Sequence, residues 1–365
     1  MPENTLTRRD LNRATLARQL LLSRSEGPVL DTVEQLVGLQ AQLPAAPFVG
    51  LWSRLEAFGR DELLELIEQR HVVRATMMRA TLHLVTASDY WLLRPTLQSA
   101  LAHQYGTVLG RRTKEIDLPS ALEAAQSFFA TPHTFSEFRE VLERLGAGAD
   151  IRALAYGVRT HVPLIQVPSP AAAWGYPGST RFVTAQSWLG RPLPEETSLP
   201  ELIVRYLAAF GPARAIDIQA WGGFPPLRDE LEKLRSELVV FPGERGGELF
   251  DLPEAPRPAA DVPAPPRFLS EFDNLLLAWK DRSRVIAEGH LRRIMATPVL
   301  MHPTFLLDGF VAGTWKLEGQ GEAATLAIEP FAPVSTADRD ALVSEGERLA
   351  RFMDPAAQSV QVTVT

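Results

Sequence analysis

The spacing of hydrophobic residues near the start of the chain changes from helical to extended. Apolar side chains recur every three to four positions in three stretches, which predicts helices at residues 6–22, 32–42 and 61–70. Two apolar runs follow at 72–78 and 81–86, separated only by Arg79 and Ala80. Short runs with a two-residue connection are typical of a β-hairpin, so this region predicts three helices followed by a hairpin.

The same order of elements recurs twice further along the chain. Residues 119–161 contain three segments of helical pattern, one of them capped by Thr134 or Ser136, and the strand-like runs VPLIQVP and RFVTAQ come next. Residues 199–238 contain three more helical segments with glycine-rich breaks. The run ELVVFPGERGGELFDL then predicts a hairpin that turns at residues 243–247.

Three helices and a two-stranded hairpin make a winged helix, the variant of the helix-turn-helix in which the hairpin is the wing. We therefore predict an α+β fold with three tandem winged helix-turn-helix motifs and a C-terminal β-rich segment. The predicted divisions are winged helices at 1–115, 116–197 and 198–251, a proline-rich linker or strap at 252–266 and the β-rich region at 267–365. No residue-level repeat supports this grouping, so a generic α+β protein is the alternative.

The overall charge argues at first against a nucleic-acid partner, because 37 basic and 44 acidic residues give a net charge of -7. The charge is unevenly placed, however. Residues 70–114 hold 7 basic and 1 acidic residue, a balance of +6, and residues 278–316 hold 6 and 3, a balance of +3. Residues 201–266 and 317–365 carry the acidity, at -4 and -5. An acidic total can therefore coexist with one basic surface.

Several kinds of site find no support in the sequence. The chain of 365 residues has no cysteine, which excludes disulfides, thiolate metal sites and cysteine nucleophiles. The seven histidines are scattered without a metal-binding spacing, and no glycine-rich nucleotide loop or serine-hydrolase elbow is present. No apolar run is long enough to span a membrane, and the N-terminus lacks the apolar core of a secretory signal. We expect no cofactor, no metal and no membrane partner, and a cytoplasmic location.

The segment VEQLVGLQAQLPAAPFVGLWSRL, residues 33–55, contains two glutamines two positions apart. On a continuous α-helix Gln40 and Gln42 would point in different directions. Pro44 predicts that the helix ends there, so both amides could project into the space beyond it. A polar helix end with capping side chains is the alternative interpretation.

Four segments together resemble the AlkZ and YcaQ superfamily of winged-helix DNA glycosylases, in order and over nearly the whole chain. The segments are residues 38–42 (GLQAQ), 79–84 (RATLHL), 268–275 (FLSEFDNL) and 311–317 (VAGTWKL). Members of the AlkZ branch carry Gln-x-Gln where the YcaQ type carries Gln-x-Asp, and this chain has Gln40 and Gln42. The resemblance implies a C-shaped monomer with a basic channel for double-stranded DNA and a nucleoid-associated location. It also implies excision of N7-alkylated guanines and unhooking of drug-derived interstrand crosslinks.

The resemblance makes Gln40 and Gln42 the candidate catalytic residues. A family hairpin that contacts DNA is placed on the strand around Trp315 and Lys316. The residues expected to contact DNA are then Arg79, Arg282, Arg284 and Lys316 for phosphates or grooves, and Trp315 as an apolar wedge. Each has an ordinary alternative, because a strand arginine is often salt-bridged and a tryptophan beside a strand is often part of the core.

An N7-alkylated guanine is cationic and leaves as a neutral base, so the enzyme needs no acid to protonate it. The carbonyl oxygens of two glutamines can place a water and direct negative dipole at the developing sugar cation. The sequence thus predicts a monofunctional DNA glycosylase. A non-catalytic winged-helix transcriptional regulator is the main alternative, and a protein that sequesters the free alkylating drug is a third.

Overall fold

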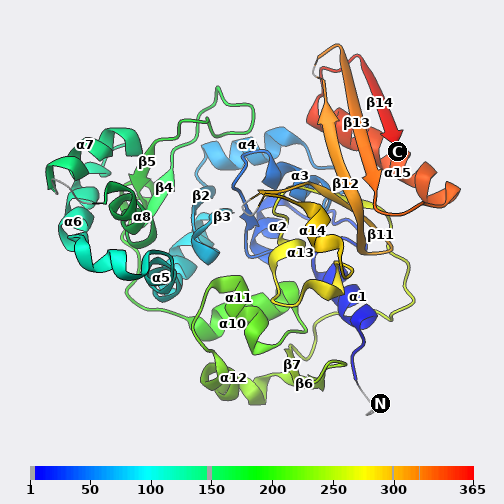
Figure 1. Ribbon diagram of the computed structural model, residues 1–365, viewed down its shortest axis with the longest axis horizontal. Helices are drawn as coiled ribbons and strands as arrows, with labels where there is room; N and C mark the ends of the chain where they lie inside the picture. The colour runs from blue at the N-terminus through cyan, green and yellow to red at the C-terminus, as the bar shows by residue number, and fades with distance from the viewer. Residues whose placement is uncertain (1–4, 146–149, 298–299, 320) are drawn as a thin grey trace.

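The computed structural model of the chain is a mixed assembly of helices and sheets (Figure 1). It describes residues 5–145, 150–297, 300–319 and 321–365. This agrees with the predicted α+β composition, whereas the interpretation of the elements as tandem winged helices stays a prediction.

The first part of the chain has the predicted order of helices and hairpin, with one short strand and one helix that the hydrophobic pattern did not indicate. The elements are α1 (Arg8–Arg18), α2 (Val29–Gln35), β1 (Leu39–Gln40), α3 (Ala46–Trp52), α4 (Arg60–Glu68), β2 (Val72–Thr76), the 3₁₀ turn η1 (Met78–Ala80) and β3 (Leu82–Thr86). The strands β2 and β3 pair antiparallel from Val72 opposite Thr86 to Thr76 opposite Leu82, which confirms the hairpin. The unpredicted helix is α3, whose residues are all buried and therefore show no alternation.

The second part begins with a long helix that the hydrophobic pattern did not predict, and the three helices and two strands that follow confirm the predicted second group. Its elements are α5 (Ala87–Leu109), η2 (Gly110–Glu115), α6 (Leu118–Phe128), α7 (Phe135–Leu145), α8 (Ile151–His161), β4 (Leu164–Gln166), β5 (Phe182–Thr184) and α9 (Ala185–Leu189). Of the two proposed caps of α7, Thr134 is the one used, because its hydroxyl accepts from the backbone N–H of Glu137 at 3.2 Å.

The hairpins of the first two groups form one sheet. The strand order is β1-β3-β2-β4-β5, and β2 meets β4 where Ala75 lies opposite Ile165. The short strand β1 therefore lies at an edge of this sheet. The predicted division at 115 separates strands that share this sheet, whereas the division at 197 does not. Whether the two divisions bound separate domains stays a prediction.

The third group lies at the lower side of Figure 1 and has its own hairpin. Its elements are α10 (Leu199–Phe210), α11 (Ala215–Gly222), α12 (Arg228–Leu234), η3 (Arg235–Glu237), β6 (Val239–Pro242) and β7 (Glu248–Asp251). The hairpin turns where Gly243 N–H donates to Gly247 O at 3.0 Å, as predicted.

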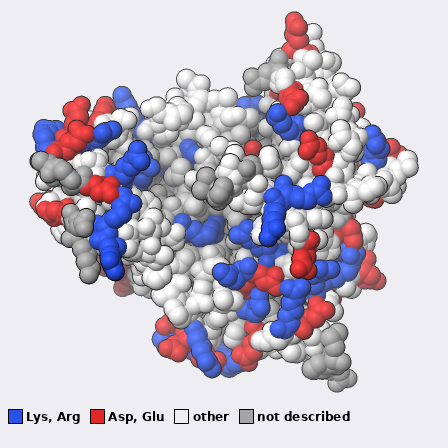
Figure 2. All heavy atoms as spheres, in the orientation of Figure 1, with Lys and Arg blue, Asp and Glu red and all other residues white. Residues whose placement is uncertain are grey.

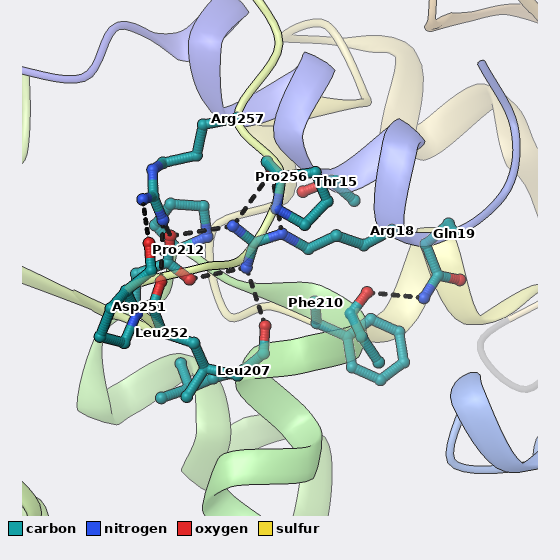
Figure 3. Close-up of polar contacts among 12 residues, drawn as sticks. Thr15, Arg18, Gln19, Leu207, Phe210, Pro212, Asp251, Leu252, Pro256 and Arg257 are labelled. Carbon is teal, nitrogen blue, oxygen red and sulfur yellow. Dashed lines mark hydrogen bonds and ion pairs between the residues drawn. The ribbon is translucent and has the colours of Figure 1, made fainter. Parts of the chain in front are cut away.

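The proline-rich residues 252–266 contain no helix or strand and form a strap beside α1. Arg9 and Arg13 of α1 donate to the carbonyls of Ala260 and Val262 at 2.7 and 2.6 Å. Further along α1, Arg18 forms a bidentate ion pair with Asp251 at 2.6 and 2.8 Å and also reaches the strap (Figure 3). This stretch was predicted to be a linker or a strap, and its contacts with α1 are those of a strap.

The C-terminal region is built on a second five-stranded sheet, at the upper right of Figure 1. Its elements are β8 (Arg267–Leu269), α13 (Asn274–Leu277), η4 (Arg282–Arg284), α14 (His290–Ile294), β9 (Met295–Thr297), β10 (Leu300–Met301), β11 (Thr304–Leu307), β12 (Phe310–Glu318), β13 (Ala323–Pro330), α15 (Thr336–Met353) and β14 (Ser359–Val364). The strand order is β14-β13-β12-β11-β8. Helix α15 and α3 share an apolar core with this sheet, so the C-terminal region packs directly on the glutamine-bearing part of the chain.

Candidate active site

Gln40 ends a short strand and Gln42 follows in a bend, so the prediction of a helix that reaches residue 42 is wrong. Helix α2 ends at Gln35, and the chain reverses through Val37 and Gly38, whose φ angles are 55° and 83°. A Cβ on Gly38 would lie 2.4 Å from Val85 Cγ1 and 2.9 Å from Leu84 O, so only glycine fits this turn. The reversal delivers Leu39 and Gln40 to the edge of β3 as strand β1.

The path of the chain changes the relation between the two glutamines. On a continuous helix residues two apart diverge, whereas here the chain leaves a strand at Gln40 and bends at Gln42. Both side chains reach the turn of the β2–β3 hairpin: Gln40 Oε1 accepts from Arg79 Nη2 at 2.6 Å, and Gln42 Oε1 accepts from Leu82 N–H at 2.7 Å. The structure therefore brings together the two predicted catalytic amides and Arg79.

The two glutamines differ in exposure but share one chemical property. Gln40 is 6% exposed, whereas Gln42 lies at the surface. Each carbonyl oxygen has two lone pairs, and each accepts one hydrogen bond from the protein. Each oxygen thus keeps a lone pair for one further donor, such as a water.

Arg79 is held at the hairpin turn in an unusual backbone conformation. Its φ is 56° and that of Ala80 is 54°, both in the left-handed region that residues other than glycine adopt at a cost. The guanidinium bridges Gln40 and the carbonyl of Trp221 in α11, at 2.7 Å to the latter. Burial, and to a lesser degree the charge of Arg282, lowers the pKa of Arg79 to about 10, so it stays protonated at neutral pH.

A histidine that the sequence analysis left without a role lies beside Gln40. His83 is opposite Gln40 in the β1–β3 pairing and is 1% exposed. Burial, with a smaller effect from Arg79, lowers its pKa to about 3, so the ring is neutral. Its Nδ1 lies 3.1 Å from the carbonyl of Thr81, which can only accept, so Nδ1 carries the proton and Nε2 is an acceptor.

Two polar side chains from distant segments hold the backbone of the glutamine segment. Arg74 of β2 donates from Nε to Ala41 O at 2.8 Å and from Nη2 to Gln42 O at 3.1 Å. Its guanidinium also lies 5.1 Å from the ring of Tyr176, which belongs to the β4–β5 connection. Asn274, the first residue of α13, bonds the other edge of the segment.

A groove of about 850 Å³ extends from Arg79 along the segment 277–291. We call its five cationic side chains the groove cations: Arg8, Arg79, Arg245, Lys280 and Arg282. Two carboxylates, Asp281 and Glu288, also line it, which leaves an excess of positive charge. Figure 2 shows Lys and Arg gathered over the middle of the face where α13 and α14 lie in Figure 1, beside a few acidic side chains. The structure thus places the predicted Arg79 and Arg282 in one positive groove.

Two of the predicted DNA contacts are wrong, because their side chains are buried. Arg284 is 4% exposed, packs on the ring of Trp279 and donates to Pro212 O at 2.9 Å. Trp315 is 5% exposed, and its Nε1 donates to Leu269 O at 3.0 Å inside the C-terminal sheet. Neither can reach a phosphate or a base stack, so both side chains stabilise the fold.

Lys316 lies on β12, next to Trp315 but on the outer face of the sheet. Its ammonium is exposed and forms an ion pair with Glu318 at 2.8 Å. It does not line the groove that contains Arg79 and Arg282. A DNA contact by Lys316 or by its strand stays a prediction.

Sequence reasoning missed the supporting residues His83, Arg74 and Asn274. His83 and Asn274 lie inside the segments 79–84 and 268–275 that carry the family resemblance. The resemblance therefore marked their positions but gave neither residue a function. Arg74 gave no such signal, because an arginine within an apolar strand pattern also fits an edge ion pair.

The described part of the chain contains no group of three or more His, Asp or Glu side chains placed to hold a metal ion. Within the same residues, no helix combines the length and apolar character that a membrane span requires.

The fold and the site define a class of protein. A family model described as "DNA glycosylase AlkZ-like" matches residues 33–352, and the chain belongs to this family.

Two similar proteins come from Streptomyces sahachiroi. A curated relative named "Interstrand DNA cross-link repair glycosylase" is 26% identical over 363 residues, which cover 92% of this chain and 94% of the relative. The solved structure of the S. sahachiroi DNA glycosylase AlkZ aligns with a TM-score of 0.75 at 22% identity and covers 99% of this chain and 100% of that one. The second likeness shows that the fold is shared from end to end.

Proposed function

We propose that this glycosylase hydrolyses the N-glycosidic bond of N7-alkylated, cationic purines in double-stranded DNA, including drug-derived interstrand crosslinks. The observation that carries the proposal is the pair Gln40 and Gln42. Their carbonyl oxygens lie at one hairpin turn, and each keeps a free lone pair. The alternative of a non-catalytic regulator is not favoured, because the matching family is one of glycosylases.

The residues of this site suit a leaving group that is already activated. When a cationic base departs, the electron pair of the N-glycosidic bond neutralises it, so no proton donor is required. The water that attacks the sugar loses a proton to solvent. The amide oxygens of Gln40 and Gln42 can accept hydrogen bonds from that water and direct negative dipole at the oxocarbenium-like sugar. The ring of His83 is neutral and its Nε2 is unprotonated, so this residue adds another hydrogen-bond acceptor beside Gln40.

An amide is a very weak base, so the proposed reaction should be selective for bases that are already cationic. A neutral base must be protonated as it leaves, and among the described residues neither glutamine oxygen bonds a carboxylic acid that could supply the proton. We therefore expect cleavage of cationic adducts and little cleavage of neutral lesions. This selectivity separates the proposed mechanism from general acid catalysis.

The groove supports double-stranded DNA as the partner. One of the groove cations, Arg79, bonds Gln40, and the groove extends from it along the segment 277–291. A phosphate backbone bound there would bring a nucleotide to the glutamine pair. An open groove also suits a base tied to the opposite strand, which cannot rotate into a deep pocket. A monomer with three winged helices around a C-shaped channel, located in the cytoplasm with the nucleoid, completes the proposal.

The proposed reaction is monofunctional, with water and not an amine as nucleophile. We expect borohydride reduction during turnover to trap no covalent protein–DNA product. A trapped product would indicate a lyase step, for which Lys280 in the groove would be the first residue to replace.

The direct test is release of 7-methylguanine from a duplex oligonucleotide under single-turnover conditions. We expect release by the wild type and at least about a 100-fold slower rate for Gln40→Ala with Gln42→Ala, because aligned dipoles at the reacting centre contribute effects of that size. Gln186→Ala, an exposed glutamine on α9, is the matched control and should keep the wild-type rate. An inactive wild type, or a double variant as fast as the control, would overturn the proposal.

A further inference from the structure

The strand that carries Gln40 lies at the edge of its sheet, and one side-chain amide covers that edge. β1 pairs with β3 on one side only, where Ala41 N–H donates to Leu82 O at 2.7 Å. On the outer side, Asn274 Nδ2 donates to Gly38 O at 2.6 Å, and Asn274 Oδ1 accepts from Gln40 N–H at 3.2 Å. The donor and acceptor that flank Leu39 are therefore both satisfied by one residue.

This pattern is the one that a neighbouring strand would make. In a parallel ladder, the N–H of a residue donates to the C=O of the residue that precedes its partner on the next strand. The C=O of the same residue accepts from the N–H of the residue that follows that partner. The amide of Asn274 makes the same two bonds around Leu39. A carboxylate could accept from Gln40 N–H but could not donate to Gly38 O, and an aliphatic side chain could do neither.

Asn274 is itself held rigidly, although it lies 234 residues from Gln40. Its neighbour Asp273 is buried and forms a bidentate ion pair with Arg54 at 2.8 and 2.9 Å. Asp273 also caps α13 by accepting from Leu275 N–H at 3.0 Å. The C-terminal region thus presents the amide of Asn274 at a fixed place against β1.

We propose that Asn274 is a positioning residue for base excision, acting through the backbone of Gln40. The proposal rests on the proposed glycosylase function. Gln40 ends the two-residue edge strand β1, which has few ladder bonds of its own, and Gln42 follows it in a bend. Asn274 fixes the outer edge of that strand and Arg74 its end, so the side-chain amide of Gln40 meets the reacting sugar in one orientation.

The test compares Asn274→Ala with a matched variant, Asn12→Ala. Asn12 is a buried asparagine whose Nδ2, like that of the half-buried Asn274, donates to backbone carbonyls, those of Arg284 and Gly309 at 2.8 and 2.7 Å. It lies on α1 outside the glutamine site. At a temperature where both variants are folded, we expect Asn274→Ala to lower the single-turnover release of 7-methylguanine about 10- to 100-fold with DNA affinity within about twofold. Asn12→Ala should keep the wild-type rate.

A second variant tests the hydrogen-bond pattern itself. In Asn274→Asp the ionised carboxylate faces Gly38 O without a proton to donate, so the rate should be low at pH 8. Partial burial raises the pKa of a carboxyl at this place, and its protonated form has one donor and one acceptor again. The ratio of the variant rate to the wild-type rate should therefore rise as the pH falls. Amide hydrogen exchange at Gln40 N–H should be faster in Asn274→Ala than in Asn12→Ala.

Failure of this inference is distinct from failure of the proposed function. If the wild type releases base but Asn274→Ala matches Asn12→Ala, or the Asn274→Asp ratio is independent of pH, Asn274 has only a structural role. If the wild type releases no base, the proposed function fails and the positioning role fails with it.

Discussion

Arginines in this chain serve two different purposes, and their partners separate the two sets. The core arginines, Arg13, Arg18, Arg54 and Arg284, have buried side chains bonded to carboxylates or backbone carbonyls. Within the described residues, Arg79, Lys280 and Arg282 of the groove cations have no ion pair with a carboxylate. Arg13, Arg18 and Arg54 are paired with carboxylates, and Arg284 is enclosed by backbone carbonyls and a hydroxyl, whereas the second set leaves positive charge at a surface.

The contrast explains how an acidic protein can offer a nucleic-acid partner a positive groove. A buried ion pair contributes little field outside the protein, because its two charges cancel locally. Unpaired cations in a groove produce a positive potential at the surface and remain able to pair with phosphates. Counting arginines along the sequence therefore overestimates the binding surface, as Arg284 shows by lying only two residues after the groove residue Arg282.

The largest effect is expected from removing a core arginine. In Arg18→Met, Asp251 stays fully buried with only Arg257 as a charged partner (Figure 3). Breaking a buried pair by removing one partner costs about 3–5 kcal/mol. Denaturant unfolding should show a loss of that size. A loss below about 1 kcal/mol would mean that Arg18 is not a core arginine in the sense used here.

His83 predicts a pH dependence of stability. Its pKa of about 3 in the folded state lies below the ordinary value of 6.5, so the unfolded chain binds the proton more readily. This contribution is fully present above pH 6.5 and is lost at about 1.4 kcal/mol per pH unit as the pH falls toward the folded pKa. Between pH 6.5 and pH 5, the wild type should therefore lose about 2 kcal/mol more unfolding free energy than His83→Asn. Parallel pH profiles of the two proteins would contradict the burial of a neutral ring.

Replacing a groove cation should affect DNA binding and leave stability intact. We expect Arg282→Ala to weaken binding to all duplex sequences alike and to reduce the slope of log K against log salt by about 1. The free energy of unfolding should change by no more than about 0.5 kcal/mol. Arg351→Ala, an exposed arginine near the end of α15, is the control and should leave the salt dependence unchanged.

The smallest effect is expected for Lys316→Ala. Its ammonium pairs with Glu318 outside the groove, so the salt slope of DNA binding should fall by clearly less than in Arg282→Ala. Fluorescence anisotropy at several salt concentrations measures this. A slope reduced as much as in Arg282→Ala would place the C-terminal sheet in the DNA interface and would enlarge the binding surface beyond the groove.

Local patterns in the sequence predicted most elements that precede residue 252. Periodicity indicated the β2–β3 hairpin, the helices α6, α7 and α8 and the helices of the third group, because those signals depend on neighbours in the chain, but it did not indicate the long helix α5. Helix α3 is buried on every side and gave no alternation. The pairing of Ala75 with Ile165 joins strands far apart in the sequence, which no local pattern records.

The site could be predicted only in part. The short motif located Gln40 and Gln42, but the assumption of a continuous helix failed because Gly38 turns the chain into a strand. The burial of Trp315 and Arg284 depends on packing from other segments and could not be read from their neighbours. The same holds for Asn274, whose partner Gln40 lies at the other end of the chain.

The measurement that tests the account most directly compares two bases in one duplex context, 7-methylguanine and the neutral lesion hypoxanthine. A site built on the amides of Gln40 and Gln42 should release the cationic base, should lose that activity in the double alanine variant and should leave hypoxanthine in place. Release of both bases at similar rates, or release of 7-methylguanine that does not need the two glutamines, would contradict it.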